Sequence, residues 1–286
     1  MLTDATTRTP AGRQATSRSG QRLRWMTALL LWSFVGVPAS AGAAVPAPHD
    51  AIAADTAAES GTFRALTYNI AGLPAVLSSA KTDRPSSTTT IGTRLEPYDV
   101  VNVQEDFNYH VFLYAAANHQ YRTPTSGGAG FGSGLNTLSM FPLEGPTRMS
   151  WETCWIGSGD CLTPKGFTFT RIHPANDVII DVYNLHTDAG SENRDMTARS
   201  ANLDQLTRFI AARSTGNAVI VMGDTNSRYT RAGDSIAEFA GANGLRDAWV
   251  DLVRDSQTPS EGRARATLRR DRTDRQLRNR GQSVLP

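Results

Sequence analysis

Short runs of apolar and β-branched residues recur through the middle of the chain and predict a series of β-strands. The folded region is expected to begin at Phe63, where the first of these runs starts. The runs that fit the strand pattern cover residues 63–70, 99–104, 134–141, 166–172, 178–186 and 217–224.

Three longer segments between or after these runs have a helical spacing of apolar positions instead. They cover residues 107–118, 194–213 and 235–243. In the second segment Leu203, Leu206 and Ile210 fall at i, i+3 and i+7, with Phe209 beside them. Such a stripe packs against a sheet, so these residues are assigned to the core and not to a site.

Strands mixed with single helices, without an internal repeat, predict an α/β sandwich. The glycine-rich segment 124–134 has neither the spacing of a P-loop nor a GxGxxG sequence. It is therefore predicted to be a flexible loop and not a phosphate-binding turn.

The N-terminal segment has the pattern of a secretory signal. Arg22 and Arg24 precede an apolar run at 25–37, which is followed by the small-x-small sequence Ala-Ser-Ala at 39–41. A membrane anchor needs about 20 apolar residues, and this run is shorter. Residues 1–41 are thus predicted to be a signal peptide of a secreted, extracellular protein.

Composition separates the chain into segments of opposite charge. Residues 42–61 are rich in alanine and proline and are predicted to form a disordered linker. Residues 42–262 hold 16 basic and 24 acidic side chains, a formal net charge of −8, whereas both ends are basic. An acidic body argues against a broad nucleic-acid footprint over its surface, and a metal site fits that charge better.

Cys154 and Cys161 are the two cysteines of the chain. Their short separation and the predicted secretion favour a small disulfide loop. A zinc site would need further ligands, and neither a histidine nor another cysteine lies within ten residues of this pair. Zinc is therefore rejected.

Acidic, amide or imidazole side chains stand at or just after the ends of four predicted strands. Each such residue has an ordinary explanation as a turn or helix-capping residue. Together they form a set suited to phosphate hydrolysis, because amide and carboxylate oxygens bind Mg²⁺ and an imidazole can donate to a phosphoryl oxygen. These residues are Asn69, Glu105, His186, Asp188, Asp224 and Asn226.

The motifs around these residues resemble those of the endonuclease/exonuclease/phosphatase superfamily, which is deoxyribonuclease-I-like, and in particular its neutral-sphingomyelinase-like branch. The resemblance covers residues 63–255 and implies a four-layer α/β sandwich with the site at one edge. The motifs are LTYNIAGLP, VVNVQED, SGLNTLSMFP, KGFTFTRI, VYNLHTDAGS and AVIVMGDTNSR.

The resemblance also implies a role for each matched residue. Asn69 and Glu105 correspond to the metal-binding positions, and the expected cofactor is Mg²⁺ or another divalent cation. His186 corresponds to the histidine that stabilises the phosphoryl oxygens, while Asp224 and Asn226 match the Gly-Asp-x-Asn motif. The role of Asp188 stays open, because family members vary there.

The implied function is secreted, metal-dependent phosphodiester hydrolysis by in-line attack of water. The substrate is a phospholipid head group or a nucleic acid, and the sequence YNIAGLP resembles the sphingomyelinase branch more. No obligate protein partner is inferred, and a monomer is expected.

The family pattern ends in a Ser-Asp-His motif whose histidine is the general base, but this chain has no histidine after His186. The domain at 62–262 is therefore expected to be C-terminally incomplete and its hydrolysis impaired. Residues 263–286 contain eight arginines. An out-of-frame segment is the favoured interpretation, because composition changes abruptly after Glu261. An inert disordered terminus and a tail that makes the chain a non-catalytic polyanion-binding protein stay open.

Overall fold

The computed structural model describes residues 61–78 and 82–260. All of them belong to one compact unit, Thr56–Pro286. The predicted signal peptide at 1–41, nearly all of the predicted linker and the arginine-rich segment 263–286 lie outside the described residues. Within the described part, no helix has both the length and the apolar composition needed to cross a membrane.

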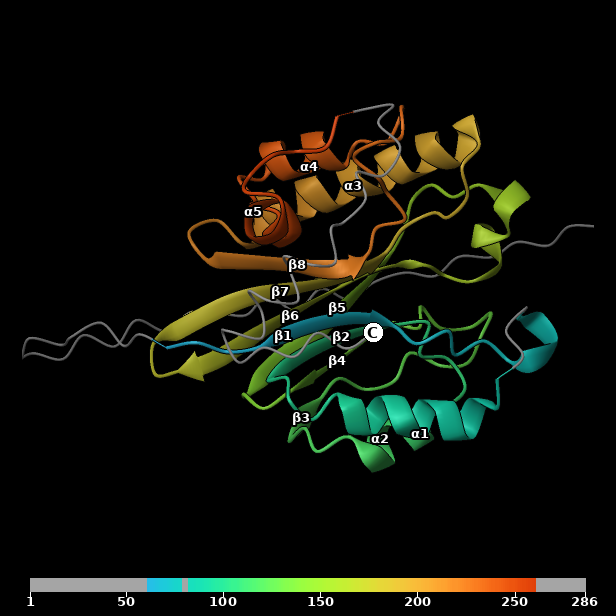
Figure 1. Cartoon of the computed structure of the whole chain (residues 1–286), viewed down its shortest axis with the longest axis vertical. Helices are drawn as coiled ribbons and strands as arrows, with labels where there is room; N and C mark the ends of the chain where they lie inside the picture. Colours follow the sequence, from blue (N-terminus) through green and yellow to red (C-terminus); the bar gives the residue numbers. More distant parts are fainter. Residues whose placement is uncertain (1–60, 79–81, 261–286) are drawn as a thin grey trace, which may run out of the picture. The chain divides into compact units, whose positions relative to one another are not determined.

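Two four-stranded sheets form the centre of the domain (Figure 1). The first has the order β1-β2-β4-β3 and the second the order β5-β6-β7-β8. Strands β1 and β2 are parallel, as are β7 and β8, and the other neighbours are antiparallel. The strands are β1 Ala65–Asn69, β2 Val100–Gln104, β3 Tyr121–Arg122, β4 Asn136–Ser139, β5 Leu143–Ser150, β6 Gly166–Ala175, β7 Val178–His186 and β8 Ala218–Asp224.

Helices cover the outer face of each sheet (Figure 1). The first sheet is covered by α1 Arg84–Arg94 and α2 His110–Ala116, and the second by α3 Asn193–Arg213, α4 Ile236–Ala242 and α5 Ala248–Val253. Three short 3-10 helices lie in the loops: η1 Ala75–Leu77, η2 Ile156–Ser158 and η3 Asp160–Leu162. The four layers are therefore helix, sheet, sheet and helix, and the predicted α/β sandwich is confirmed.

The apolar stripe of α3 packs where its spacing predicts. Leu203 and Leu206 are buried in one cluster with Phe167, Tyr183 and Leu185 of the second sheet. Burying a leucine side chain contributes about 1.5–3 kcal/mol, so this stripe is a main attachment of the helix to the sheet.

Every predicted strand and helix is present with small shifts at its ends. Among the residues that the structure describes, the prediction missed α1, α5, β3 and β5 as well as the three short 3-10 helices. Helix α1 is rich in serine and threonine, which are weak helix formers, and it begins at the Asp83 cap, which accepts a hydrogen bond from Ser86 N. Strand β5 contains Gly145 and Pro146 and tolerates them because it lies at a sheet edge.

Buried amides join the two sheets through their facing sides. Asn102 Nδ2 donates to Tyr183 O at 3.1 Å, and Asn184 Nδ2 donates to Val103 O at 3.0 Å. Gln104 Nε2 donates to Asn184 Oδ1 at 2.8 Å. Because unpaired polar groups are costly in a core, these bonds hold the sheets in one relative register. That register brings the strand ends of the two sheets together.

Substitution of Asn184 by leucine is expected to lower the free energy of unfolding by about 2–4 kcal/mol. The change removes both donors of the amide, so the main-chain carbonyls of Val103 and Asn136 each lose a buried hydrogen bond. It also removes the acceptor that Gln104 Nε2 contacts at 2.8 Å. Urea unfolding followed by tryptophan fluorescence measures the difference. The matched control is Asn118→Leu at an exposed position, and equal stability of the two variants would contradict the cross-sheet role.

Candidate active site

The predicted site residues lie at one end of both sheets. Asn69 is the last residue of β1, and Glu105 directly follows the parallel neighbour β2. His186 and Asp224 end the parallel strands β7 and β8 and are paired in register. The arrowheads of β1 and β8 point to the same side in Figure 1, so the carboxyl ends of strands from both sheets share one edge.

A single amide connects the carboxylates of the two sheets. Asn69 Nδ2 donates to Glu105 Oε1 at 2.9 Å and to Asp224 Oδ2 at 3.0 Å. The amide oxygen of Asn69 accepts from Ala71 N at 2.9 Å, which sets the orientation of the side chain. Two negative charges from different sheets thus converge on one point.

The remaining predicted residues complete the group. His186 Nε2 lies 3.7 Å from Asp224 Oδ2. Asn226 N donates to Asp224 Oδ1 at 3.1 Å, and Asn226 Nδ2 donates to Thr187 O at 3.2 Å. The structure therefore brings Asn69, Glu105, His186, Asp224 and Asn226 together, although the chain separates the first from the last by more than half its length.

The backbone around these residues is unusual. Glu105 has φ 56° and Asn226 has φ 48°, both in the left-handed region. Asparagine tolerates this conformation, but a glutamate there costs on the order of 1–3 kcal/mol and needs a surrounding structure that enforces it. Gly223, which precedes Asp224, packs so closely on the Leu185 backbone that any side chain would collide with it. The site is thus held by a constrained scaffold.

Burial determines the charge state of His186. Its side chain is only 4% exposed, and burial, together with the nearby Lys165 ammonium, lowers the pKa of His186 to about 4. The imidazole is neutral at pH 7 and carries one N–H that can donate. Its Nδ1 atom has no hydrogen-bond partner among the described residues.

Comparison with protein-family models identifies the family of this domain. The model of Endonuclease/Exonuclease/phosphatase family 2 matches residues 76–278. The chain belongs to this family. The sequence-based assignment to the superfamily is confirmed.

Sphingomyelinases are among the relatives of this family member. Those of Mycobacterium bovis and Mycobacterium tuberculosis are each 44% identical to it over 207 residues, a stretch that is 70% of this chain and 41% of theirs. The chain therefore spans less than half the length of these relatives.

Several solved structures share the fold. Sphingomyelinase C from Streptomyces griseocarneus has a TM-score of 0.55 at 20% identity, over 66% of this chain and 72% of that one. A β-hairpin deletion mutant of beta toxin from Staphylococcus aureus has a TM-score of 0.56 at 18% identity, over 65% and 74%. A beta toxin variant with bound magnesium ions has a TM-score of 0.55 at 18% identity, over 65% and 71%.

Lys165 is a neighbour of this family site that the strand-end pattern missed. It lies in the loop before β6, forms an ion pair with Asp160 and donates from Nζ to Thr187 O at 3.3 Å. Its side chain is 12% exposed. This partly exposed ammonium lies close enough to His186 to lower its pKa, and it adds positive charge to an edge that otherwise carries carboxylates. Only its place in the motif KGFTFTRI gave a signal at the sequence level.

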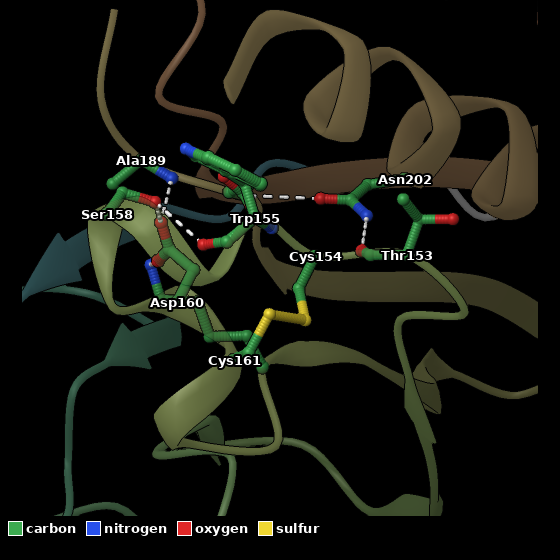
Figure 2. Close-up of a disulfide and its surroundings, with 10 residues drawn as sticks. Thr153, Cys154, Trp155, Ser158, Asp160, Cys161, Ala189 and Asn202 are labelled. Atoms are coloured by element: carbon green, nitrogen blue, oxygen red, sulfur yellow. Dashed lines mark hydrogen bonds and ion pairs between the residues drawn. A yellow bond between two sulfur atoms is a disulfide. The ribbon is translucent and has the colours of Figure 1, made fainter. Parts of the chain in front are cut away.

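The disulfide loop is attached to the chain that follows His186. Cys154 and Cys161 are joined with an Sγ–Sγ distance of 2.03 Å (Figure 2). Within the loop, Asp160 Oδ2 accepts from Ala189 N at 2.8 Å. Asn202 of α3 fixes the other side, since Asn202 Nδ2 donates to Thr153 O at 2.8 Å. The disulfide thus closes a loop that contacts the segment directly after the site residue His186.

Asp188, whose role the sequence left open, helps to attach the disulfide loop and helix α3 to the chain after β7. Asp188 Oδ2 accepts from Trp155 N at 2.8 Å, and Asp188 N donates to Asn202 Oδ1 at 3.0 Å. Its Oδ1 atom is buried without a partner among the described residues. Burial therefore raises the pKa of Asp188 to about 6.

This raised pKa predicts a stability change with pH. The folded state holds the Asp188 proton more tightly than the unfolded state, so this group stabilises the fold below about pH 4 and loses that contribution as pH rises through about 6. Asp188→Asn should remove the loss. We expect urea unfolding to show the variant gaining about 1–3 kcal/mol relative to wild type between pH 4 and pH 7. A gain independent of pH would contradict a buried, titrating carboxyl group.

A buried ion cluster supports the two loops that carry the site. Asp234 accepts from Arg199 at 2.8 Å and from Arg231 at 2.6 Å, and the side chains of Asp234 and Arg199 are 0% and 1% exposed. Arg199 Nη1 donates to Asp188 O at 2.7 Å, and Arg231 donates to Asn226 O. The cluster thus links the loop after β7 to the loop after β8. No sequence pattern indicated it.

A pocket of about 500 Å³ opens beside Asp224 and Asn226. It lies between the loop after β7 and the loop after β8, directly next to the predicted catalytic group. Its lining residues are Gly190, Ser191, Gly223, Asp224, Thr225, Asn226, Ser227, Arg228 and Arg231.

Proposed function

We propose that this chain is the site-bearing part of a secreted, divalent-metal-dependent phosphodiester hydrolase of the sphingomyelinase-like type. The observation that carries the proposal is the convergence of an amide, two carboxylates and a neutral imidazole at one sheet edge. The sphingomyelinase relatives support a phospholipid substrate. The predicted signal sequence and the disulfide support secretion.

The residues present fit a hard divalent cation such as Mg²⁺. The carboxylates of Glu105 and Asp224 both lie within 3.0 Å of one Asn69 nitrogen, so their charges converge where a cation would offset them. Mg²⁺ is bound by few protein oxygens and keeps several waters. We assign Asn69 and Glu105 to hold it, and when bound it would offset the charge that builds up on the phosphoryl oxygens.

The other residues act on the phosphate and the attacking water. His186 is neutral at pH 7 and can donate an N–H to a phosphoryl oxygen. Asp224 accepts a hydrogen bond from the water and orients it for in-line attack, and Asn226, held by Asp224 Oδ1, donates to the phosphate. No covalent intermediate with the enzyme is required.

Turnover by this chain is expected to be slow. General acid–base catalysis contributes about 10²–10⁴-fold, and the chain has no histidine after His186 to act as the base of the family motif. We further propose that the protein acts as a monomer. The alternative, a polyanion-binding protein, depends on residues 263–286, which lie outside the described residues, and no observation favours it.

Metal dependence gives the test of the proposal. Hydrolysis of bis-p-nitrophenyl phosphate should disappear with EDTA and return with Mg²⁺. In Glu105→Gln, the Mg²⁺ concentration for half-maximal rate and the Mg²⁺ Kd from calorimetry should both rise about tenfold or more, because a charged ligand is lost. Glu144→Gln, at an exposed side chain, is the matched control.

The substrate class is tested separately with sphingomyelin vesicles and supercoiled DNA under the same conditions. Release of phosphocholine without nicking of the DNA supports the sphingomyelinase-like reading. Nicking without phosphocholine release would assign the site to nucleic acid. Activity that is unaffected by EDTA and by Glu105→Gln would overturn the proposed function.

A further inference from the structure

Main-chain hydrogen bonds hold the backbone around Glu105 from several sides. Its φ of 56° lies in the left-handed region, which a glutamate keeps only where neighbouring contacts enforce it. Glu105 O accepts from Gly72 N at 3.0 Å and from Phe107 N at 3.0 Å. The next residue, Asp106, donates from its backbone N–H to Gly134 O at 2.9 Å. The direction of the Glu105 side chain therefore depends on where Gly134 lies.

Gly134 ends the glycine-rich segment 124–134 and packs directly on this backbone. A Cβ atom at Gly134 would lie only 3.0 Å from Glu105 Cα, and it would collide with the ring of Phe107. Gly134 N donates to Ser126 Oγ at 2.8 Å, which ties the end of the segment to its beginning. Because closely packed groups move together, a displacement of this loop is passed on to the backbone of Glu105.

An arginine of the second sheet joins the two ends of the same loop. Arg148, on β5, donates from its guanidinium to Pro124 O at the beginning of the loop and to Leu135 O just after its end. It also donates to Ser133 Oγ at 3.4 Å. A guanidinium carries five N–H donors in a rigid planar fork, so it can hold several acceptors in one arrangement, which a lysine ammonium cannot do.

A second connection between Arg148 and the chain at Glu105 runs through side chains. Arg148 Nη2 donates to Asn136 Oδ1 at 2.9 Å, and Asn136 Nδ2 donates to Asp106 Oδ2 at 2.8 Å. The side chains of Asn136 and Asp106 are fully buried, so water does not replace these bonds when one of them is lost. Arg148 thus reaches the residue next to Glu105 both through the loop and through this relay.

We propose that Arg148 is a positioning residue for Glu105. By fixing Asp106 at its backbone N–H and at its carboxylate, Arg148 holds Glu105 Oε1 at 2.9 Å from Asn69 Nδ2, where the carboxylates of the two sheets converge. The inference rests on the proposed function for the role of Glu105 as a metal ligand. If Arg148 contributed to stability alone, its loss would lower the free energy of unfolding without changing the Mg²⁺ affinity of the folded molecules.

Hydrogen exchange of the metal-free full chain tests the link between Arg148 and Glu105 without any ligand. In Arg148→Met, which keeps a long side chain but loses the donors, amides 105–107 and 134–137 should exchange about tenfold faster than in wild type, relative to those of β6 and β7. Arg171→Met is the matched control, because Arg171 lies on the same sheet and pairs with Asp181 at 2.8 Å. Unchanged exchange at 105–107 in Arg148→Met would overturn the proposal. Arg148→Lys, which loses the fork but keeps the charge, replaces Arg148→Met if that variant does not fold.

Calorimetric titration with Mg²⁺ tests whether the effect of Arg148 passes through Glu105. The Mg²⁺ Kd should rise about fivefold to tenfold in Arg148→Met and stay unchanged in Arg171→Met. In a Glu105→Gln background, Arg148→Met should cause no further rise, because two residues that act through one contact are not additive. An equal rise in both backgrounds would overturn the route through Glu105. A wild-type chain that binds no Mg²⁺ would contradict the proposed function, whereas hydrogen exchange would still decide whether Arg148 positions Glu105.

Discussion

Asp224→Asn is expected to lower the rate of bis-p-nitrophenyl phosphate hydrolysis by about 100-fold or more. The substitution keeps the size of the side chain but removes the carboxylate. Its Oδ2 atom accepts from Asn69 Nδ2 at 3.0 Å, and its Oδ1 atom accepts from Asn226 N at 3.1 Å. An amide nitrogen in either position would face another donor. The attacking water would then lose its acceptor, and Asn69 would lose one of the two carboxylates that orient it.

Single-turnover kinetics at saturating Mg²⁺ measure this loss, because they separate chemistry from product release. Asp255→Asn is the matched control: it removes the same charge from an exposed residue whose positive φ of 51° an asparagine tolerates. Thermal unfolding should show both variants folded. An Asp224→Asn rate within about threefold of wild type would remove Asp224 from the proposed mechanism.

Asp234→Ala is expected to cause the largest loss of stability, about 3–5 kcal/mol. The carboxylate is fully buried and balances Arg199, whose side chain is 1% exposed, as well as Arg231. Removing it leaves two guanidinium groups without their counter-charge, and one of them cannot reach water. For a domain of this size the loss corresponds to a fall in Tm of roughly 10 °C.

Urea unfolding and calorimetry measure the effect, with Glu152→Ala as the control. Glu152 pairs with Arg208 at a comparable distance of 2.9 Å, but the two side chains are 68% and 62% exposed, so its loss should cost less than about 1 kcal/mol. Similar losses in the two variants would show that Asp234 is not the buried counter-charge. A double change of Arg199 and Asp234 to leucine and alanine should recover part of the stability, because no unpaired charge is left.

The local pattern of apolar and polar residues was sufficient to predict most strands and helices of the fold. The strands carry dense β-branched and apolar runs, and the stripe of Leu203, Leu206 and Ile210 has the period of a helix. Strand β5 and helix α1 lack such patterns. The first is an edge strand interrupted by Gly145 and Pro146, and the second is a serine- and threonine-rich helix that depends on its Asp83 cap.

Local sequence pattern predicted only part of the candidate site. Asn69, Glu105, His186 and Asp224 stand at strand ends, and parallel neighbours in a sheet bring such ends together. Resemblance to the family supplied their expected roles. Lys165 was missed because it lies in a loop and reaches the site only through its long side chain.

The sequence by itself determined the elements, the layered fold class and the strand-end residues, because hydrophobic period and turn residues act over a few neighbouring positions. Tertiary structure decided which residues meet. The amides of Asn102 and Asn184 set the register of the two sheets, and Asp234 joins loops that follow different strands. These contacts span many residues of sequence, and their energies depend on burial and on matched partners, neither of which a linear pattern contains.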